Sequence, residues 1–333
     1  MPLMNARNGF SEELPRDVEQ SPRFGGNPTN AIHIYKALNQ SSLYNRNQNR
    51  TITPVKDEKE ELSISSTRIM NDGRKIPLLG LGAHDIHSKQ AVLWALESGY
   101  RLIDTASRYH NEQSVGEAVR CSNIPRCEIY VVTKVYFTEH GYKETMDAFY
   151  KSLTRLGLGY VDLYLIHFPV PSGVVGSWQA MIDLRSRGLI RSIGVSNFNI
   201  QHLEALRQQT GVVPAVNQIE VHPFLQMKEL TQYCKRHNIT IQAFSPLTKG
   251  EKLCDPILSY VAKKYNKTTA QILVRWSLQK GYACIPKSAQ LERIKENAKV
   301  FDFSIDRADM ELIDGLEENY RTGRDKILWP WEG

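Results

Sequence analysis

The chain has 333 residues, and its 42 Lys and Arg against 36 Asp and Glu give a formal net charge of +6. So small an excess does not predict nucleic-acid binding, which requires a concentrated basic face, and it is compatible with a pocket for a phosphorylated cofactor. The sequence has no apolar run long enough to cross a membrane and no hydrophobic signal core. We therefore expect a cytoplasmic protein without a nucleic-acid or membrane partner.

The cysteines and histidines do not indicate a metal centre. The five cysteines lack the CxxC spacing of common zinc and redox sites, which favours a reducing compartment. Glu220 and His222 share one face of a predicted strand, but no third ligand follows at a useful spacing. No metal site is expected.

The N-terminal part of the chain differs in composition from the rest. Residues 1–65 are rich in Asn, Arg, Ser, Gln and Pro and have almost no apolar periodicity, which predicts a disordered polar extension. A single folded domain is expected over residues 66–333. Its first apolar stretches, 67–70 and 75–79, are joined by Asn71-Asp72-Gly73, and Asp-Gly between two apolar runs predicts a β-hairpin.

From Gly80 onward, strand-like and helix-like segments alternate. Strands are predicted near residues 80–83, 102–106, 129–135, 161–167, 192–197, 215–220, 240–245 and 283–287. Helices are predicted over residues 91–96, 141–157, 178–184, 200–206, 230–234 and 270–278, and the second of these has the clearest helical spacing of apolar residues. Eight strand–helix units over about 250 residues are typical of a (β/α)8 TIM barrel, an α/β fold.

An open doubly wound sheet is the alternative fold for such a pattern. Its dinucleotide fingerprint requires three spaced glycines at the start of a helix. Here Gly80-Leu81-Gly82 is followed by Ala83-His84-Asp85, with no third glycine and no helix start. The pattern therefore favours the barrel.

Several predicted strands end in residues that an apolar strand would otherwise avoid. Three of them end at Asp104, Lys134 and His167, and a fourth ends at Ser196-Asn197. Burying such groups is costly unless they form pairs or take part in chemistry. Because the carboxyl ends of parallel barrel strands meet on one face, where active sites lie, we expect these side chains to surround one pocket.

Tyr109 follows the second strand and is a candidate proton donor. A free phenol has a pKa of about 10, which makes it a weak acid at neutral pH. A nearby ammonium lowers that pKa, and Lys134 would supply the charge while Asp104 keeps Lys134 protonated. His167 would orient a carbonyl oxygen. The four side chains together predict the general acid of a carbonyl reduction.

Each of these residues also has a structural alternative. Asp104 and Lys134 could form an ion pair between neighbouring strands, and His167 could be a core histidine that donates to a backbone carbonyl. Lys134 could also be the Schiff-base lysine of an aldolase barrel. The placement of all four residues at adjacent strand ends favours the active-site interpretation.

Five stretches, in order over about residues 66–320, resemble the aldo-keto reductase family. They are Gly99-Tyr100-Arg101-Leu102-Ile103-Asp104-Thr105-Ala106, Leu165-Ile166-His167-Phe168-Pro169, Gly194-Val195-Ser196-Asn197-Phe198, Val216-Asn217-Gln218-Ile219-Glu220-Val221-His222-Pro223, and Ile285-Pro286-Lys287-Ser288 with Arg293, Glu296 and Asn297 after it. The resemblance implies the TIM-barrel fold, the catalytic tetrad Asp104, Tyr109, Lys134 and His167, and hydride transfer from a nicotinamide.

The resemblance also implies a set of cofactor contacts. They are assigned to Gly82, Asp104, Ser196, Asn197, Gln218, Phe244, Ser245, Leu247, Lys287, Ser288, Arg293, Glu296 and Asn297. In this assignment Ser196, Asn197 and Gln218 hold the carboxamide, and Phe244 stacks on the nicotinamide ring. Lys and Arg beside a hydroxyl suit a phosphate dianion, so a 2′-phosphate pocket at Lys287, Ser288 and Arg293 favours NADPH over NADH.

The expected substrate mouth departs from the usual family pattern. Substrate contacts are implied for His84, Tyr136 and His167. His84 stands where a Trp is frequent, and Phe168 replaces a Trp after His167, so a less apolar pocket is expected. The short segments 136–142 and 320–333 resemble prostaglandin F synthase-like and glyoxal reductase-like members.

The expected function is reduction of a small-molecule aldehyde or ketone by a monomer. The intact His167 implies reduction of a carbonyl rather than of a carbon–carbon double bond. The long N-terminal extension leaves one alternative open, a cofactor-binding regulatory barrel like the channel β-subunits of this family.

Overall fold

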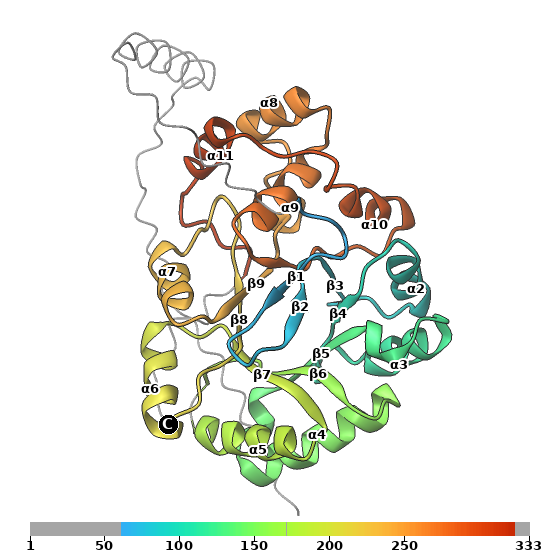
Figure 1. Ribbon diagram of the computed structural model, residues 1–333, viewed down its shortest axis with the longest axis vertical. Coiled ribbons are helices and arrows are strands. Elements are labelled where there is room, and N and C mark those ends of the chain that lie inside the picture. The colour runs from blue at the N-terminus through green and yellow to red at the C-terminus, as the bar shows by residue number, and fades with distance from the viewer. Residues whose placement is uncertain (1–60, 171, 324–333) are drawn as a thin grey trace, which may run out of the picture. The chain divides into compact units, whose positions relative to one another are not determined.

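The computed structural model describes residues 61–170 and 172–323, which form one barrel. Its strands are β3 (Gly80–Gly82), β4 (Leu102–Asp104), β5 (Tyr130–Val135), β6 (Val161–Ile166), β7 (Ile190–Ser196), β8 (Val216–Glu220), β9 (Thr240–Phe244) and β10 (Ala283–Cys284). They pair in parallel with their sequence neighbours from β3 to β10. Helices surround this ring of strands (Figure 1).

The barrel closes where its first and last strands meet. Leu79 forms a parallel bridge with Cys284, whose backbone N–H donates to the Leu78 carbonyl at 2.7 Å. The Gly82 N–H donates to the Pro286 carbonyl at 3.1 Å. A Cβ on Gly82 would lie 2.8 Å from the Ile285 carbonyl oxygen, so glycine permits this close approach. The closed ring brings all eight carboxyl ends to one face.

The outer helices follow the strands in sequence. They are α2 (Lys89–Glu97), α3 (Glu112–Cys121), α4 (Tyr142–Leu156), α5 (Val174–Ser186), α6 (Ile200–Thr210), α7 (Lys228–Arg236), α8 (Pro256–Tyr265), α9 (Thr269–Gln279), α10 (Leu291–Ala298) and α11 (Arg307–Asp314). Side-chain caps define several starts, such as Asp255, which accepts from the backbone N–H groups of Ile257 and Leu258 ahead of Pro256. Short 3-10 helices are η2 (Ser107–Tyr109), η3 (Arg126–Glu128), η4 (Phe137–Glu139) and η5 (Thr248–Gly250).

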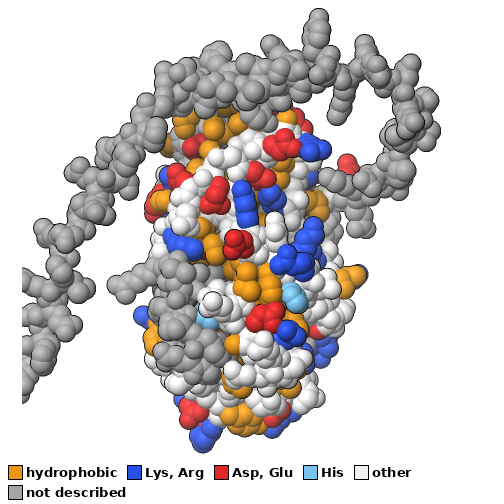
Figure 2. Space-filling view, turned by 90° about the vertical axis from the view of Figure 1, so that its left-hand side faces the viewer, with side chains coloured by type: hydrophobic (Ala, Val, Ile, Leu, Met, Phe, Trp, Pro, Cys, Tyr) orange, Lys and Arg blue, Asp and Glu red, His pale blue; other side chains and the backbone are white. Residues whose placement is uncertain are grey.

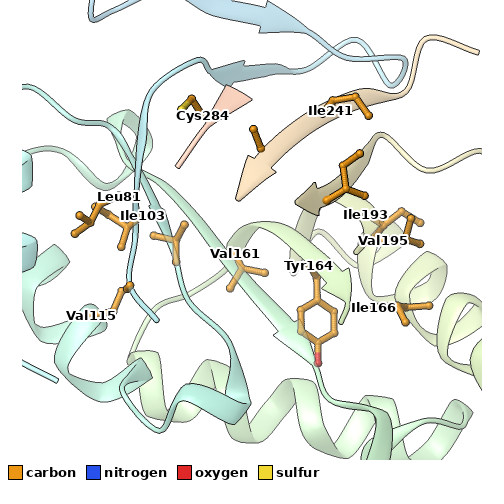
Figure 3. Close-up of a cluster of buried hydrophobic side chains, with 14 of the residues drawn as sticks. Leu81, Ile103, Val115, Val161, Tyr164, Ile166, Ile193, Val195, Ile241 and Cys284 are labelled. Carbon is orange, nitrogen blue, oxygen red and sulfur yellow. The ribbon is translucent and has the colours of Figure 1, made fainter. Parts of the chain in front are cut away.

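The strands bury side chains on both faces, in two separate apolar layers. The outer layer, between strands and helices, contains Ile103, Tyr164 and Ile193, which Figure 3 shows beside other strand residues. The inner layer, inside the ring, contains Leu102, Val132, Leu163, Leu165 and Val216 among others. The alternation of inner and outer residues follows from the two-residue period of a strand.

A hairpin covers the amino-terminal end of the barrel interior. β1 (Thr67–Ile69) and β2 (Lys75–Pro77) pair antiparallel across a turn in which Gly73 has a φ of 79°. Met70 and Ile76 are buried in the inner layer, and Figure 1 shows the hairpin in front of the ring. The hairpin therefore seals one end of the barrel, and the opposite face is left for the site.

The predicted barrel is confirmed in its eight strands, its hairpin and all six predicted helices. Residues 1–60 lie outside the described residues, so the disordered extension stays a prediction; within the described part, Leu62 already packs against the outer layer. No helix in the described ranges is long and apolar enough to span a bilayer. On the side drawn in Figure 2, acidic and basic side chains are interspersed rather than separated by sign.

Candidate active site

An ammonium lies at the centre of the carboxyl-terminal face. Lys134 Nζ is 2.6 Å from Asp104 Oδ1, donates to the Thr105 carbonyl at 2.9 Å, and lies 3.4 Å from Tyr109 Oη. Its side chain has no exposed surface, whereas Tyr109 is partly exposed. The structure thus brings together three of the four predicted tetrad residues through direct polar contacts.

Burial and charge act in opposite directions on the ionisation of this cluster. Burial favours the neutral amine, but Asp104 and Tyr109 together outweigh it, so the pKa of Lys134 lies above its ordinary value. Burial also raises the pKa of Tyr109, and the opposing charge of Lys134 does not cancel this rise. The expected lowering of the Tyr109 pKa is therefore wrong for this structure. The phenol keeps its proton at neutral pH, which is the form a proton donor requires.

His167 follows β6, two strands after the one that precedes Tyr109, and its ring lies beside the phenol. The His167 ring meets the Tyr109 ring edge to face at 5.7 Å between centroids and stacks on Phe168 at 4.3 Å. Asn197 Nδ2 donates to the His167 backbone carbonyl at 3.0 Å. These contacts fix the position of the imidazole at the edge of the pocket.

Two of the predicted substrate residues contact the rings of Tyr109 and His167. The His84 ring contacts the Tyr109 ring at 4.7 Å, and the Tyr136 ring lies 5.8 Å from the His167 ring. His84 is exposed and Tyr136 is half-buried. A carbonyl compound that contacts Tyr109 and His167 would therefore also meet the imidazole of His84 and the phenol of Tyr136.

Buried polar residues that the sequence analysis did not single out hold the Tyr109 turn in place. Asn111 Nδ2 donates to the carbonyls of Ala83 and Ile86 at 2.7 and 2.9 Å, while Asn111 Oδ1 accepts from Thr105 Oγ1 at 2.5 Å. These bonds join the loops after β3 and β4. The only signal in the sequence is a pair of polar residues, Asn111-Glu112, at the start of an amphipathic helix.

A second tie connects the Tyr109 turn with the loop after β5. Ser107 Oγ donates to Glu139 Oε2 at 3.2 Å, and the same oxygen accepts from the Tyr136 backbone N–H at 3.4 Å. Ser107 begins η2, which ends at Tyr109. Glu139 therefore couples the position of the phenol to that of Tyr136.

Three predicted carboxamide contacts lie in one hydrogen-bonded chain. Gln218 Nε2 donates to Asp104 Oδ2 and to Gln242 Oε1, both at 2.7 Å. Ser196 Oγ donates to the Gln218 carbonyl at 2.9 Å, and Asn197 Nδ2 lies 3.0 Å from Ser196 Oγ. The side-chain amides of Gln218 and Asn197 use their N–H groups within the protein. Their oxygens are the acceptors that a carboxamide NH2 needs.

The remaining predicted cofactor residues lie on the loops after β9 and β10. Phe244 is half-buried at the end of β9, and Ser245 has a φ of 49° in a loop that continues through Leu247. After β10, the Gln290 N–H donates to Ser288 Oγ at 3.1 Å just before α10 begins. Helix N-termini favour anions, so this turn suits a phosphate.

The two basic residues around that turn are exposed to solvent, whereas the acidic residue at the other end of α10 already accepts a hydrogen bond. Lys287 and Arg293 are exposed, while Ser288 and Asn297 are buried. Glu296 Oε1 accepts from Thr268 Oγ1 at 2.8 Å, which ties α10 to the start of α9. Gly82 is also among the predicted cofactor contacts. In this structure the close approach of the first and last strands already accounts for a glycine at this position.

The chain is similar to known proteins over most of its length. The aldo/keto reductase family model matches residues 82–318. An aldo-keto reductase of Mycolicibacterium smegmatis is 46% identical over 79% of this chain and 98% of its own length. A glyoxal reductase of Bacillus subtilis is 43% identical over 80% of this chain and 99% of its own length.

Solved structures are similar to the chain as well. An aldo/keto reductase from Brucella melitensis has a TM-score of 0.74 and 44% identity, and the match covers 76% of this chain and all of that one. A Bombyx mori aldo-keto reductase in complex with NADP has a TM-score of 0.75 and 35% identity, over 81% of this chain and 99% of that one. The chain belongs to the aldo/keto reductase family, and its barrel carries out the oxidoreduction of carbonyl compounds.

Proposed function

We propose that the protein reduces small aldehydes and ketones to alcohols with NADPH, and that Tyr109 donates the proton. The observation that carries this proposal is the buried ammonium of Lys134 between Asp104 Oδ1 and Tyr109 Oη. Lys134 favours the phenolate that remains after proton transfer, and Asp104 keeps Lys134 charged throughout. The protein thereby stabilises the charge that develops in the transition state.

The binding groups support NADPH as the cofactor. Ser196, Asn197 and Gln218 would hold the carboxamide, and Phe244 would stack on the nicotinamide. Lys287, Ser288 and Arg293 would hold the 2′-phosphate, with Glu296 and Asn297 on the adenine side and Ser245 and Leu247 along the pyrophosphate. When bound, the cofactor supplies the hydride. The relative from Bombyx mori, solved with NADP, supports this choice.

The side chains of the mouth would place the reacting carbonyl. Its oxygen would accept from Tyr109 Oη, with the His167 ring beside it, and the carbon would face the nicotinamide pocket. His84 and Tyr136 would contact the rest of the substrate. All of these residues belong to one chain, and the proposed active unit is a monomer.

Two other functions fit the same geometry less well. A Schiff-base lysine must be neutral to attack a carbonyl, but Lys134 is buried, paired with Asp104 and has a raised pKa. A regulatory barrel would bind the cofactor without needing a complete proton donor, and here Tyr109, Lys134 and Asp104 are in contact.

Turnover by the purified protein tests the proposal. We expect the protein to oxidise NADPH in the presence of butanal or methylglyoxal and to form the alcohol. The loss of NADPH absorbance measures this oxidation. NADPH binding without turnover of any aldehyde in a wide panel would favour the regulatory barrel. Borohydride trapping of a substrate on Lys134 without cofactor would favour the aldolase alternative.

A further inference from the structure

A guanidinium lies one residue before the proposed proton donor. Arg108 belongs to η2, is exposed, and its Cζ lies 5.6 Å from the centroid of the Tyr136 ring. The Tyr136 ring in turn lies 5.8 Å from the His167 ring. The Tyr136 ring therefore contacts both Arg108 and His167.

Two carboxylates in the neighbouring loops already have other partners. Glu139 accepts from Ser107 Oγ and from the Tyr136 N–H, and Asp85 Oδ2 lies 2.9 Å from His84 Nδ1. Within residues 61–170 and 172–323, no Asp or Glu forms an ion pair with Arg108. Its recorded polar contact is with His110 Nε2 at 3.3 Å.

Other cations contribute to the field around the mouth. Burial lowers the pKa of His84, the charge of Asp85 opposes this, and the positive charges of Lys287, Lys134 and Lys249 add to the lowering. The rim near His84 and Tyr109 is thus close to several cations. These cations, together with Asp85, set the field that a charged group meets beside His84.

We propose that Arg108 gives the enzyme a preference for aldehydes and ketones that carry a carboxylate a few atoms from the carbonyl. The inference rests on the proposed carbonyl reduction and adds the substrate class. A guanidinium offers paired N–H donors that match the two oxygens of a carboxylate. The Tyr136 ring holds the guanidinium near the proton donor by a cation–π contact.

Two four-carbon aldehydes test the inference. Succinic semialdehyde and butanal differ only in a carboxylate against a methyl group at the far end. The readout is the ratio of kcat/KM for the acid to kcat/KM for butanal, which cancels any general loss of activity. In the native protein this ratio is expected to exceed one, and in Arg108→Gln it is expected to fall about three- to fivefold through KM for the acid, as for an exposed charge pair.

Two further variants sharpen the result. Arg108→Lys keeps the charge and should retain most of the ratio, whereas Arg307→Gln on α11 removes an equal charge elsewhere and should leave the ratio unchanged. A native ratio near one, or an unchanged ratio in Arg108→Gln, would overturn the inference while butanal reduction still upheld the proposed function. Absence of NADPH oxidation with both aldehydes would instead refute the proposed function itself.

Discussion

Lys134 Nζ and Asp104 Oδ1 lie 2.6 Å apart, although the two side chains are only 0% and 4% exposed. Removing two charges from water is costly, and their attraction compensates for this only when further hydrogen bonds satisfy both groups. Here Thr105 accepts a second bond from Lys134, and Gln218 donates one to Asp104. The pair therefore serves to hold a charge at a fixed point beside Tyr109.

The first prediction concerns the removal of one member of this pair. Asp104→Asn leaves a buried ammonium without its counter-charge, so the free energy of unfolding should fall by about 3–5 kcal/mol in urea denaturation at neutral pH. The double variant Asp104→Asn with Lys134→Met should recover part of that loss. A matched control is Asp147→Asn, whose ion pair with Lys143 has the same 2.6 Å separation but is exposed. Equal effects of the two Asn substitutions would contradict the role of burial.

The second prediction concerns the proton donor. Tyr109→Phe removes the hydroxyl but keeps the ring that contacts His84 and His167. Carbonyl reduction should fall by a factor of about 100 to 10,000, as for loss of a general acid, while NADPH binding stays close to native. The measurements are NADPH-dependent turnover and NADPH fluorescence titration. Tyr142→Phe on the outer helix α4 is the control, and full activity in Tyr109→Phe would refute the assignment.

A third prediction follows from a histidine beside the mouth. Burial lowers the pKa of His140 to about 4, although a backbone contact with Val170 partly opposes this. Between pH 6.5 and 4 the unfolded chain binds a proton at this site that the folded chain does not, so stability falls as the pH falls through that window. The full effect is about 3 kcal/mol, from a shift of roughly two and a half pH units.

The variant His140→Gln isolates this contribution. Urea denaturation of both proteins at pH 7 and pH 4.5 gives the loss of stability for each. We expect the native protein to lose about 2 kcal/mol more than the variant over this interval, since the variant has no imidazole to titrate. Identical losses would show that His140 is protonated in the folded protein.

The fourth prediction concerns cofactor preference. Arg293 is exposed on α10, near the turn formed by Ser288 and Gln290. If its guanidinium contacts the 2′-phosphate, Arg293→Ala should raise the Kd of NADPH about tenfold or more and hardly change that of NADH. Fluorescence titration with both cofactors measures this, with Arg307→Ala as the control. A similar loss for both would place the 2′-phosphate elsewhere.

Most of the barrel and the meeting of polar side chains at its carboxyl-terminal face could be predicted because both depend on local pattern. The inner and outer layers follow from the strand period, and Asp104, Lys134 and His167 were conspicuous as polar residues at apolar strand ends. The ties made by Asn111 and Glu139 could not be predicted, because each joins loops that only the closed barrel brings together. Helices α3, α8, α10 and α11 lie outside the six predicted ranges; α8 and α11 are additions to the regular strand–helix alternation, whereas α3 and α10 follow β4 and β10 within it.

The direction of the Tyr109 pKa shows a second limit. The sequence indicated a cation beside the phenol, and the structure contains it at 3.4 Å. How much water the site excludes depends on the packing of the whole face, which no motif describes. Burial raises the Tyr109 pKa more than Lys134 lowers it. The contact between Tyr109 and Lys134 is therefore predicted correctly, but the direction of the pKa shift is not.

The last prediction concerns a glycine that the packing of two helices requires. A Cβ added to Gly116 in α3 would lie 1.8 Å from the Leu156 carbonyl oxygen and 2.5 Å from its carbon, both backbone atoms at the end of α4. Gly116→Ala gains about 1 kcal/mol in helix propensity but must separate α3 from α4, so a net loss of about 2–3 kcal/mol is expected in urea denaturation. Gly159→Ala, with no atom within 4 Å of its added Cβ, is the control. If Gly116→Ala proved as stable as that control, α3 and α4 would not be in the close contact described.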